Sequence, residues 1–472
     1  MYHIILPLLR VVIRRATTSI EIVQLFFDAD FKSEFGSGAT STLLVDELAR
    51  ADARGVKVRI LLDKIILSFG VSSTDTLIAA FRARGANVVR DFPIWEPGRL
   101  HSKAMVVDGK TAYVMGATLQ QEMFDTKDHP VEDLSLHRGG KEPLHTESAK
   151  ISGPAVADIE KFFAEFWNHA DTKYFGGHDQ IPTPVAPPAS GSHTVQVVRT
   201  IPPAIGVGPP TGEIEILEAY QRAFANAHRF IYVEHQYLLF RPILEAIRVA
   251  MDRNPSLQVI AVLNENPDQD EFMYREWQAR AISQVLGPPG PQLGLFSLWT
   301  VSPAAAGKTA IRRIYVEGKL AVVDDTWMTL GTANLDGLSM AAFETADNLA
   351  PPALLLPFQG MLDTKRHAEL NVVVFDGISG AARSGIVREA RCEAWSEHLA
   401  LPPTQCAATP DGTWLSLWNS TAQANVTNLK RPSPTLKGYV LPWVPGGLLE
   451  AASQLNALGI PLSNLDVRQD RD

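Results

Sequence analysis

The stretch His-Ser-Lys-Ala-Met-Val-Val-Asp at residues 101–108 recurs as Glu-Gly-Lys-Leu-Ala-Val-Val-Asp at residues 317–324. The two copies share Lys-x(4)-Asp and stand 216 positions apart (317 minus 101). Each runs on to a glycine followed by small residues, at Gly116 and at Gly331. Such a repeat indicates one active site built from two halves. The change from His101 to Glu317 falls on the most reactive side chain of the motif.

Composition limits the class of protein. At 472 residues the chain is long enough for two or three domains, or for one large duplicated unit. Its 43 basic and 52 acidic residues give a net charge of −9, which argues against a dedicated nucleic-acid binder. The two cysteines, Cys392 and Cys406, do not suggest a disulfide framework.

The first 13 residues are apolar but are broken by His3, Pro7 and Arg10, so they lack the pattern of a signal peptide. They predict a first helix that faces the core. No apolar run approaches the ~20 residues of a membrane span. We expect a soluble chain, leave peripheral membrane contact open, and predict no cellular compartment.

Secondary-structure patterns repeat along with the motif. Each half shows a strand, an amphipathic helix and a second strand, which favours βαβ units and a mainly parallel sheet. The segments are residues 16–27, 43–54 and 56–63 in the first half, and 227–237, 242–253 and 257–263 in the second. The motif strands predict hairpins that turn at Asp108-Gly109 and at Asp324-Asp325. Each half closes with a tryptophan-bearing helix, at 159–167 and 386–395.

The expected organisation is a first lobe at 1–170, a Pro/Gly/Ser-rich linker at 171–200 and a second lobe at 201–400. Residues 401–472 lack the repeat. They predict an irregular C-terminal extension packed on the second lobe.

The chemistry follows from strand geometry. Residues i and i+2 of a strand share one face, so His101 and Lys103 point into the same space, as do Glu317 and Lys319. An imidazole can act as a nucleophile, and a lysine ammonium is a compact partner for phosphate oxygens. Two lysines would neutralise a phosphodiester and its transition state, which favours phosphoryl chemistry without a required metal.

With these motifs the sequence resembles the phospholipase D superfamily, whose signature is His-x-Lys-x(4)-Asp present twice. The likeness extends over about 390 residues, from Ala16 to Leu401, and includes residues 231–237, 331–339 and 369–374. It implies two α/β lobes, each a mixed mainly parallel sheet flanked by helices, with pseudo-twofold symmetry and the site between them. It also implies a phosphohistidine intermediate.

The resemblance assigns roles residue by residue. His101 matches the nucleophile, Lys103 and Lys319 match the phosphate-binding lysines, and Asn334 matches a polar phosphate contact, with Thr332 and Gln236 as further substrate-binding candidates. Counting from the glycines, Gly116 and Gly331, gives Leu119 as the first-half counterpart of Asn334, with Thr118 and Gln120 beside it. The motif aspartates Asp108 and Asp324 are expected to hold the strand ends.

Family members also orient each histidine with a carboxylate that opens a later strand. Asp133 and Glu369 are the candidates, and Glu344 is a weaker alternative to Glu369. His145 with Glu147 stays ambiguous. No metal-binding motif or phosphate-cradling glycine loop is recognisable, so no cofactor is expected.

Glu317 leaves three interpretations open. Glutamate takes over the acid–base work; or the site forms the phosphohistidine but turns over slowly or prefers another acceptor; or the site is disabled. An ordinary glutamate titrates near ~4.3 and is a poor acid at neutral pH, whereas burial or a neighbouring carboxylate would raise its pKa.

The predicted function is therefore a monomeric phospholipase D-type phosphodiesterase that cleaves or transfers the headgroup of a phospholipid or similar phosphodiester. The alternatives are a nuclease of the same superfamily, which the negative charge disfavours, and an impaired phosphate- or membrane-binding relative. The apolar insert at 351–358 would suit a lipid surface if it were exposed.

Overall fold

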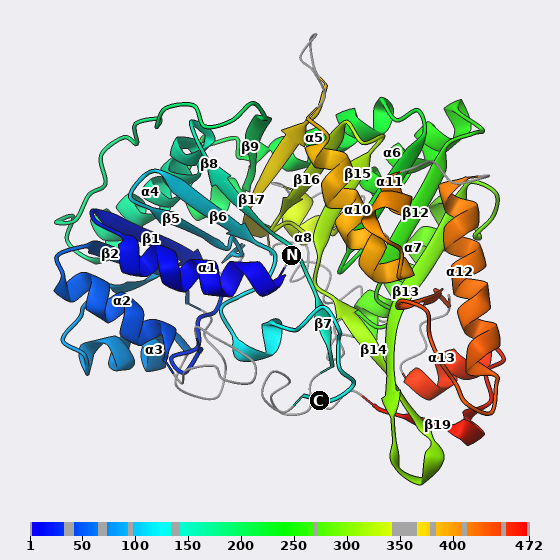
Figure 1. The fold of residues 1–472 in the computed structure, drawn as a ribbon. Helices are drawn as coiled ribbons and strands as arrows, with labels where there is room; N and C mark the ends of the chain where they lie inside the picture. Colours follow the sequence, from blue (N-terminus) through cyan, green and yellow to red (C-terminus); the bar gives the residue numbers. More distant parts are fainter. Residues whose placement is uncertain are drawn as a thin grey trace.

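The computed structural model describes most of the chain. The described residues are 2–32, 42–64, 73–92, 98–133, 142–267, 272–341, 366–377, 384–407, 413–444 and 450–469. The insert at 351–358 and Glu344 lie outside them. Figure 1 shows the two halves side by side, the first in blue and cyan and the second in green to red.

The first half is built on a six-stranded sheet in the order β3-β2-β1-β5-β6-β8. Its strands are β1 (Ser19–Gln24), β2 (Lys57–Asp63), β3 (Val89–Phe92), β5 (Ala104–Val107), β6 (Thr111–Met115) and β8 (Ser148–Ser152). The β1–β2 and β2–β3 pairs are parallel, whereas β1–β5, β5–β6 and β6–β8 are antiparallel. The parallel share is thus smaller than predicted, because the motif hairpin adds antiparallel strands.

The second half repeats this arrangement within a larger sheet in the order β10-β9-β17-β16-β15-β11-β12-β13-β14-β19. The strands that repeat the first half are β11 (Phe230–His235), β12 (Gln258–Leu263), β13 (Leu293–Pro303), β15 (Lys319–Val323), β16 (Trp327–Gly331) and β17 (Arg366–Phe375). The added strands are β9 (Thr194–Ile201), β10 (Glu213–Ile214), β14 (Thr309–Val316), β18 (Val440–Pro442) and β19 (Leu465–Val467). Both predicted motif hairpins are confirmed, with Val107 opposite Thr111 and Val323 opposite Trp327.

Two short strands join the halves. β4 (Gly98–Leu100) of the first half pairs in parallel with β17 of the second. β7 (Leu144–His145), also of the first half, pairs in parallel with β14. Each of these pairings leads directly into one copy of the repeated motif. The backbone of β17 holds the strand that precedes His101, and the backbone of β7 holds the strand that precedes Glu317.

Helices cover the outer faces of the sheets, and the inner faces share one core. The outer helices are α1 (Tyr2–Arg15), α2 (Leu44–Ala53) and α3 (Ser73–Arg82) on the first sheet, and α5 (Glu215–Ala225), α6 (Arg241–Arg253) and α7 (Phe272–Val285) on the second. Between the sheets lie α4 (Ala155–Tyr174) and α10 (Ile386–Leu399). Their tryptophans, Trp167 and Trp395, are buried in a single continuous cluster with side chains of both sheets.

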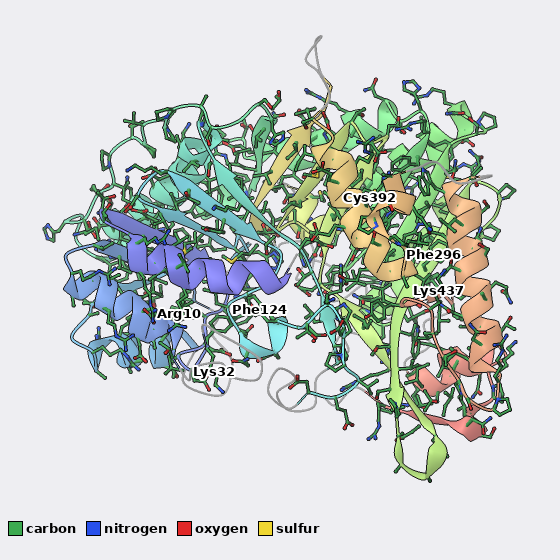
Figure 2. The ribbon with its side chains drawn as sticks, viewed as in Figure 1. Arg10, Lys32, Phe124, Phe296, Cys392 and Lys437 are labelled. Atoms are coloured by element: carbon green, nitrogen blue, oxygen red, sulfur yellow. The ribbon has the colours of Figure 1, made fainter. Side chains whose placement is uncertain are left out.

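The C-terminal region is regular, not irregular as predicted. It contains α11 (Pro403–Ala407), α12 (Trp414–Leu429) and α13 (Ala451–Ala457), while β18 and β19 join the second sheet. Trp418 packs on Phe296 with ring centroids 5.1 Å apart. Figure 2 labels Phe296 in the second half of the molecule. The helical pattern was hidden because α12 is flanked by proline-rich sequence and has no counterpart in the first half.

The predicted linker at 171–200 is shorter in the structure. α4 continues to Tyr174, and β9 begins at Thr194 and pairs with β17 from Thr194 to Thr200. The other domain boundaries remain predictions. In the described part of the chain, no helix is both long enough and apolar enough to cross a bilayer.

Candidate active site

His101 is held by the opposite half of the molecule. It follows β4, and its backbone N–H donates to the Ala368 carbonyl of β17 at 3.1 Å. Its Nδ1 lies 2.7 Å from Oε1 of Glu369, a fully buried carboxylate. The Thr332 hydroxyl donates to Glu369 Oε2 at 2.5 Å. The carboxylate therefore orients the ring with Nδ1–H as donor and leaves Nε2 as the nucleophilic nitrogen.

Lys103 occupies the other side of this imidazole. Its Nζ lies 3.1 Å from His101 Nε2 and donates to the His101 carbonyl at 2.8 Å. Burial, opposed by Glu369 and reinforced by Lys103, lowers the pKa of His101 to about 3, so the ring is neutral at physiological pH. Burial also lowers the pKa of Lys103 to about 7, and the charge of Lys319 acts in the same direction.

The second motif places Glu317 and Lys319 together. Lys319 Nζ donates to Glu317 Oε1 at 2.9 Å, to the Glu317 carbonyl at 2.6 Å and to Gln236 Oε1 at 3.3 Å. Both side chains are nearly buried. Because the charges of Lys319 and Glu317 act on Lys103, the two motifs face one site. His101, Lys103, Glu317, Lys319 and Gln236 thus come together as the sequence suggested.

Two other substrate-binding candidates differ in their contacts. The Thr332 hydroxyl is engaged with Glu369, so it supports that carboxylate. Asn334 is 4% exposed, and its Oδ1 has no hydrogen-bond partner among the described residues. Paired bridges, Phe27 with Leu119 and Leu238 with Leu335, make Thr118 the counterpart of Asn334. Counting from the glycines in the sequence had given Leu119, which is the next residue along the chain.

Asp108 and Asp324 close the motif strands, as expected. Asp108 accepts backbone N–H groups of Thr17, Thr18 and Ser19 at 2.7–3.1 Å. Asp324 accepts those of His228, Arg229 and Phe230 at 2.7–2.8 Å. Both aspartates have φ near 55°, a left-handed conformation that Asp tolerates better than most residues. These contacts fasten each motif strand to the start of its central strand.

The register of the two halves defines which residues correspond. Met115 pairs with Ser148 as Gly331 pairs with Asn371. Gly116 N donates to Glu147 O as Thr332 N donates to Leu370 O. Counting back one residue on the later strand matches Glu369 with Thr146. Thr146, rather than Asp133, therefore occupies the place of the orienting carboxylate in the first half, and a role for Asp133 remains a prediction.

Sequence reasoning missed His367. It lies on β17, two residues before Glu369, and its ring centroid is 4.9 Å from that of His101. Its Nδ1 is 3.5 Å from the same Glu369 oxygen that binds His101. His367-x-Glu369 obeys the same strand alternation as His101-x-Lys103, and that spacing was the available signal.

A buried cluster of histidines and acids lies at the junction of the halves. We call Asp125, His129, His145, Glu147, Glu234, Glu397 and His398 the junction cluster. His145 reaches Glu234 at 2.7 Å, Glu397 at 2.9 Å and Glu147 at 3.2 Å. His129 bridges Asp125 and Glu397, and His398 binds Glu234. The carbonyl of His145 accepts the Glu317 N–H at 2.7 Å, so the cluster supports the second motif.

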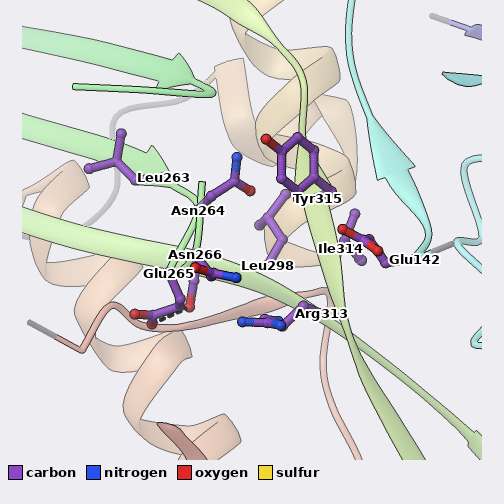
Figure 3. A pocket seen from close by; sticks show the side chains of 10 residues that line it. Glu142, Leu263, Asn264, Glu265, Asn266, Leu298, Arg313, Ile314 and Tyr315 are labelled. Carbon is purple, nitrogen blue, oxygen red and sulfur yellow. Dashed lines mark hydrogen bonds between the residues drawn. The ribbon is translucent and has the colours of Figure 1, made fainter. Parts of the chain in front are cut away.

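A small cavity is lined in part by Arg313, Ile314 and Tyr315 of β14, the strand that leads to Glu317 (Figure 3). Its volume is about 10 Å³, room for about one water. Asn264 at its rim donates to the Val316 carbonyl and accepts the Val316 N–H, both at 2.8 Å. Gln236 Nε2 donates to the Tyr315 hydroxyl at 2.9 Å. These bonds fix the backbone just before Glu317.

The fold and site define a two-lobed, phospholipase D-like α/β protein. A family model described as "Cardiolipin synthase, PLD-like domain" matches residues 9–129. Phospholipase D A of Dictyostelium discoideum is 23% identical over 363 residues, which cover 64% of this chain and 27% of that protein. Phospholipase D zeta 2 of Arabidopsis thaliana is 24% identical over 271 residues, 49% of this chain and 24% of that protein.

A solved structure shows the same fold. The phosphatidylserine synthase of Haemophilus influenzae Rd KW20 aligns with a TM-score of 0.51 at 13% identity, covering 79% of this chain and 81% of that one. The chain spans about a quarter of the length of the first curated relatives it matches. In sequence the chain is thus similar to proteins of the phospholipase D superfamily, and the solved structure shows that it shares their fold.

Proposed function

We propose that the protein is a phospholipase D-type phosphodiesterase that cleaves or transfers the headgroup of a phospholipid through a phosphohistidine on His101. The observation that carries the proposal is the contact between His101 Nδ1 and Glu369 at 2.7 Å. This contact directs the lone pair of Nε2 into the site, where a neutral imidazole can attack phosphorus.

The two lysines supply the charge that this attack needs. Lys103 touches the nucleophilic nitrogen, and Lys319 belongs to the opposite motif. A phosphodiester between them would place its non-bridging oxygens against two ammonium groups, which stabilise the negative charge of the transition state. Asn334, three residues after Gly331, would add a side-chain amide as a further polar contact for the phosphate. A membrane-peripheral, monomeric enzyme is the form we propose.

The first prediction concerns His101. We expect a phosphoryl adduct on His101 when the protein is incubated with a mixed phospholipid panel, detected by mass spectrometry of acid-protected peptides. His101→Gln should abolish the adduct and reduce cleavage by at least about 10³-fold, because covalent catalysis is lost. The matched control is Arg248→Ala, on the exposed face of α6. Normal cleavage by His101→Gln would refute the proposal.

A further inference from the structure

The two halves of the site differ at three corresponding positions, not one. The first motif is served by His101, the carboxylate of Glu369 and the hydroxyl of Thr332. The register places Glu317, Thr146 and Gly116 at the same three positions of the second motif. The backbone contact is retained, since Glu317 N donates to His145 O as His101 N donates to Ala368 O. The second motif therefore lacks all three groups: the imidazole, the carboxylate that orients it and the hydroxyl that supports this carboxylate.

The replacements fit one another sterically. A Cβ on Gly116 would lie 2.4 Å from the Thr146 hydroxyl, so the absence of a side chain at 116 makes room for Thr146. Thr146 is 1% exposed, and its hydroxyl has no hydrogen-bond partner among the described residues. This half therefore has neither a carboxylate to hold an imidazole nor an imidazole to be held.

The contacts of Glu317 decide what it can do with a proton. Its Oε1 accepts a hydrogen bond from Lys319 Nζ at 2.9 Å, an ion pair in a nearly buried setting. In this geometry the carboxylate accepts from the ammonium, so it is placed to receive a proton and not to donate one. The Lys319 ammonium already donates to Glu317 and to Gln236.

Lys103 and His367 lie on the attacking side. In-line displacement puts the leaving oxygen opposite the nucleophile. Lys103 Nζ lies 3.1 Å from the attacking Nε2, and His367 converges with His101 on the same Glu369 oxygen. Within the described part of the chain, the group facing the leaving oxygen is thus the Glu317–Lys319 pair, which offers charge but no ready proton.

We propose that the substrate is a phosphodiester or pyrophosphate diester whose leaving group departs as a stable anion, and that Glu317 serves as the base for an incoming hydroxyl. This inference rests on the proposed function and narrows its substrate class. In the first step, His101 Nε2 bonds to phosphorus and the P–O bond to the leaving group breaks without protonation. In the second step, an acceptor hydroxyl bonds to phosphorus as Glu317 takes its proton. The P–N bond then breaks, its electron pair returns to His101, and Glu317 releases the proton to solvent.

The test compares two lipids that differ only in their leaving group, phosphatidyl-p-nitrophenol and phosphatidylcholine, presented in the same mixed micelles. Nitrophenol is a far stronger acid than choline. We expect the native protein to release nitrophenol at least about 100-fold faster, since general acid catalysis is worth about 10²–10⁴-fold. Equal rates of release would overturn the inference.

Two variants test the role of the second motif. In Glu317→Gln, which keeps an acceptor for Lys319, nitrophenol should appear as a burst, the His101 adduct should accumulate, and turnover should fall about 100-fold. In Glu317→His/Thr146→Asp, the restored pair should raise choline release at least tenfold above Glu317→His alone. Arg248→Ala provides the baseline. Normal turnover by Glu317→Gln, or no gain from adding Thr146→Asp in a folded protein, would contradict the assignment.

The outcomes separate this inference from the function on which it rests. A His101 adduct formed equally well from both lipids would leave the proposed function standing and refute the leaving-group requirement. No adduct from either lipid, with no nitrophenol released, would refute both.

Discussion

At the scale of single residues, the site keeps one imidazole neutral and one lysine close to its titration point. Burial lowers the pKa of His101 to about 3 and that of Lys103 to about 7. The nucleophile is thus ready over the whole physiological range. The charge of Lys103, which we propose binds the phosphate, therefore changes more with pH in this range than the charge of His101.

This predicts a pH-dependent anion affinity. As the pH rises through about 7, Lys103 loses its proton and sulfate should bind more weakly, by about tenfold per pH unit at most. Sulfate is the suitable probe, because its own charge is constant in this range. Isothermal titration calorimetry should show the dependence in the native protein and in Lys110→Arg, a control on the exposed hairpin turn.

Lys103→Arg should abolish that dependence, because a guanidinium remains charged throughout. An unchanged pH slope in Lys103→Arg would assign the effect to another group.

Residue-level prediction from sequence succeeded for the paired side chains of each motif. His101 and Lys103 come together, as do Glu317 and Lys319, although residues 101–103 lie between β4 and β5 and Glu317 lies just before β15. Glu369 was identified only through the family resemblance. Thr146, Gly116 and His367 were missed, because their importance depends on which strand lies opposite which. The offset between corresponding residues changes from 216 at the motifs (317 minus 101) to 223 at the later strands (371 minus 148).

At the scale of elements, each motif strand is anchored by the aspartate at its end. Burial opposes ionisation of Asp108, but hydrogen bonds from Thr18 and Ser19 outweigh it and lower the pKa of Asp108. Asp324 makes the equivalent contacts in the second half. The hairpins were predictable, because Asp-Gly between two apolar runs is a strong local signal. The pairing of β4 and β7 with the sheet of the second half was not, since short strands carry no periodicity.

Asp108→Asn should destabilise the fold by about 2 kcal/mol, because a charged acceptor of three backbone N–H groups is replaced by an amide. Asn tolerates the left-handed backbone, so the change reports the hydrogen bonds and not strain. Urea unfolding measures the loss, with Asp252→Ala, an exposed helix pair, expected within about 0.5 kcal/mol of the native protein. Equal stability of the two variants would show that the anchor is dispensable.

At the scale of the whole molecule, the junction cluster links the halves through ionisable groups. Burial and the charge of Glu234 raise the pKa of Glu147 to about 7. An acid whose folded pKa is raised holds its proton more tightly in the folded state. The unfolded chain releases that proton from about pH 4.5 upward, so folding loses stability as the pH rises from there to about 7.

Glu147→Gln mimics the protonated acid and should remove this loss. We expect the variant to match the native protein near pH 4.5 and to be more stable by about 1–3 kcal/mol near pH 8. Thermal and urea unfolding at both pH values measure the difference. Glu218→Gln, an exposed helix acid, is the control. A variant that is less stable at pH 8 would show that the ionised carboxylate is needed by its histidine partners.

The paired lobes were predictable from the repeat, but the cluster between them was not. Its members come from four separated segments, and nothing in their spacing brings them together. The parallel share of the sheets was overestimated for a similar reason, since strand–helix–strand units reveal only the parallel pairs.

The pairing of β4 and β7 with the second sheet has a further consequence for the proposed chemistry. Because the first lobe contributes two strands to the sheet of the second, the lobes cannot swing apart on a hinge without breaking backbone hydrogen bonds of that sheet. The distance between His101 and Glu317 is therefore set by the shared backbone. If the protein acts as proposed, the width of the site at the phosphorus atom should select the substrate, and turnover should need no cycle of opening and closing between the lobes.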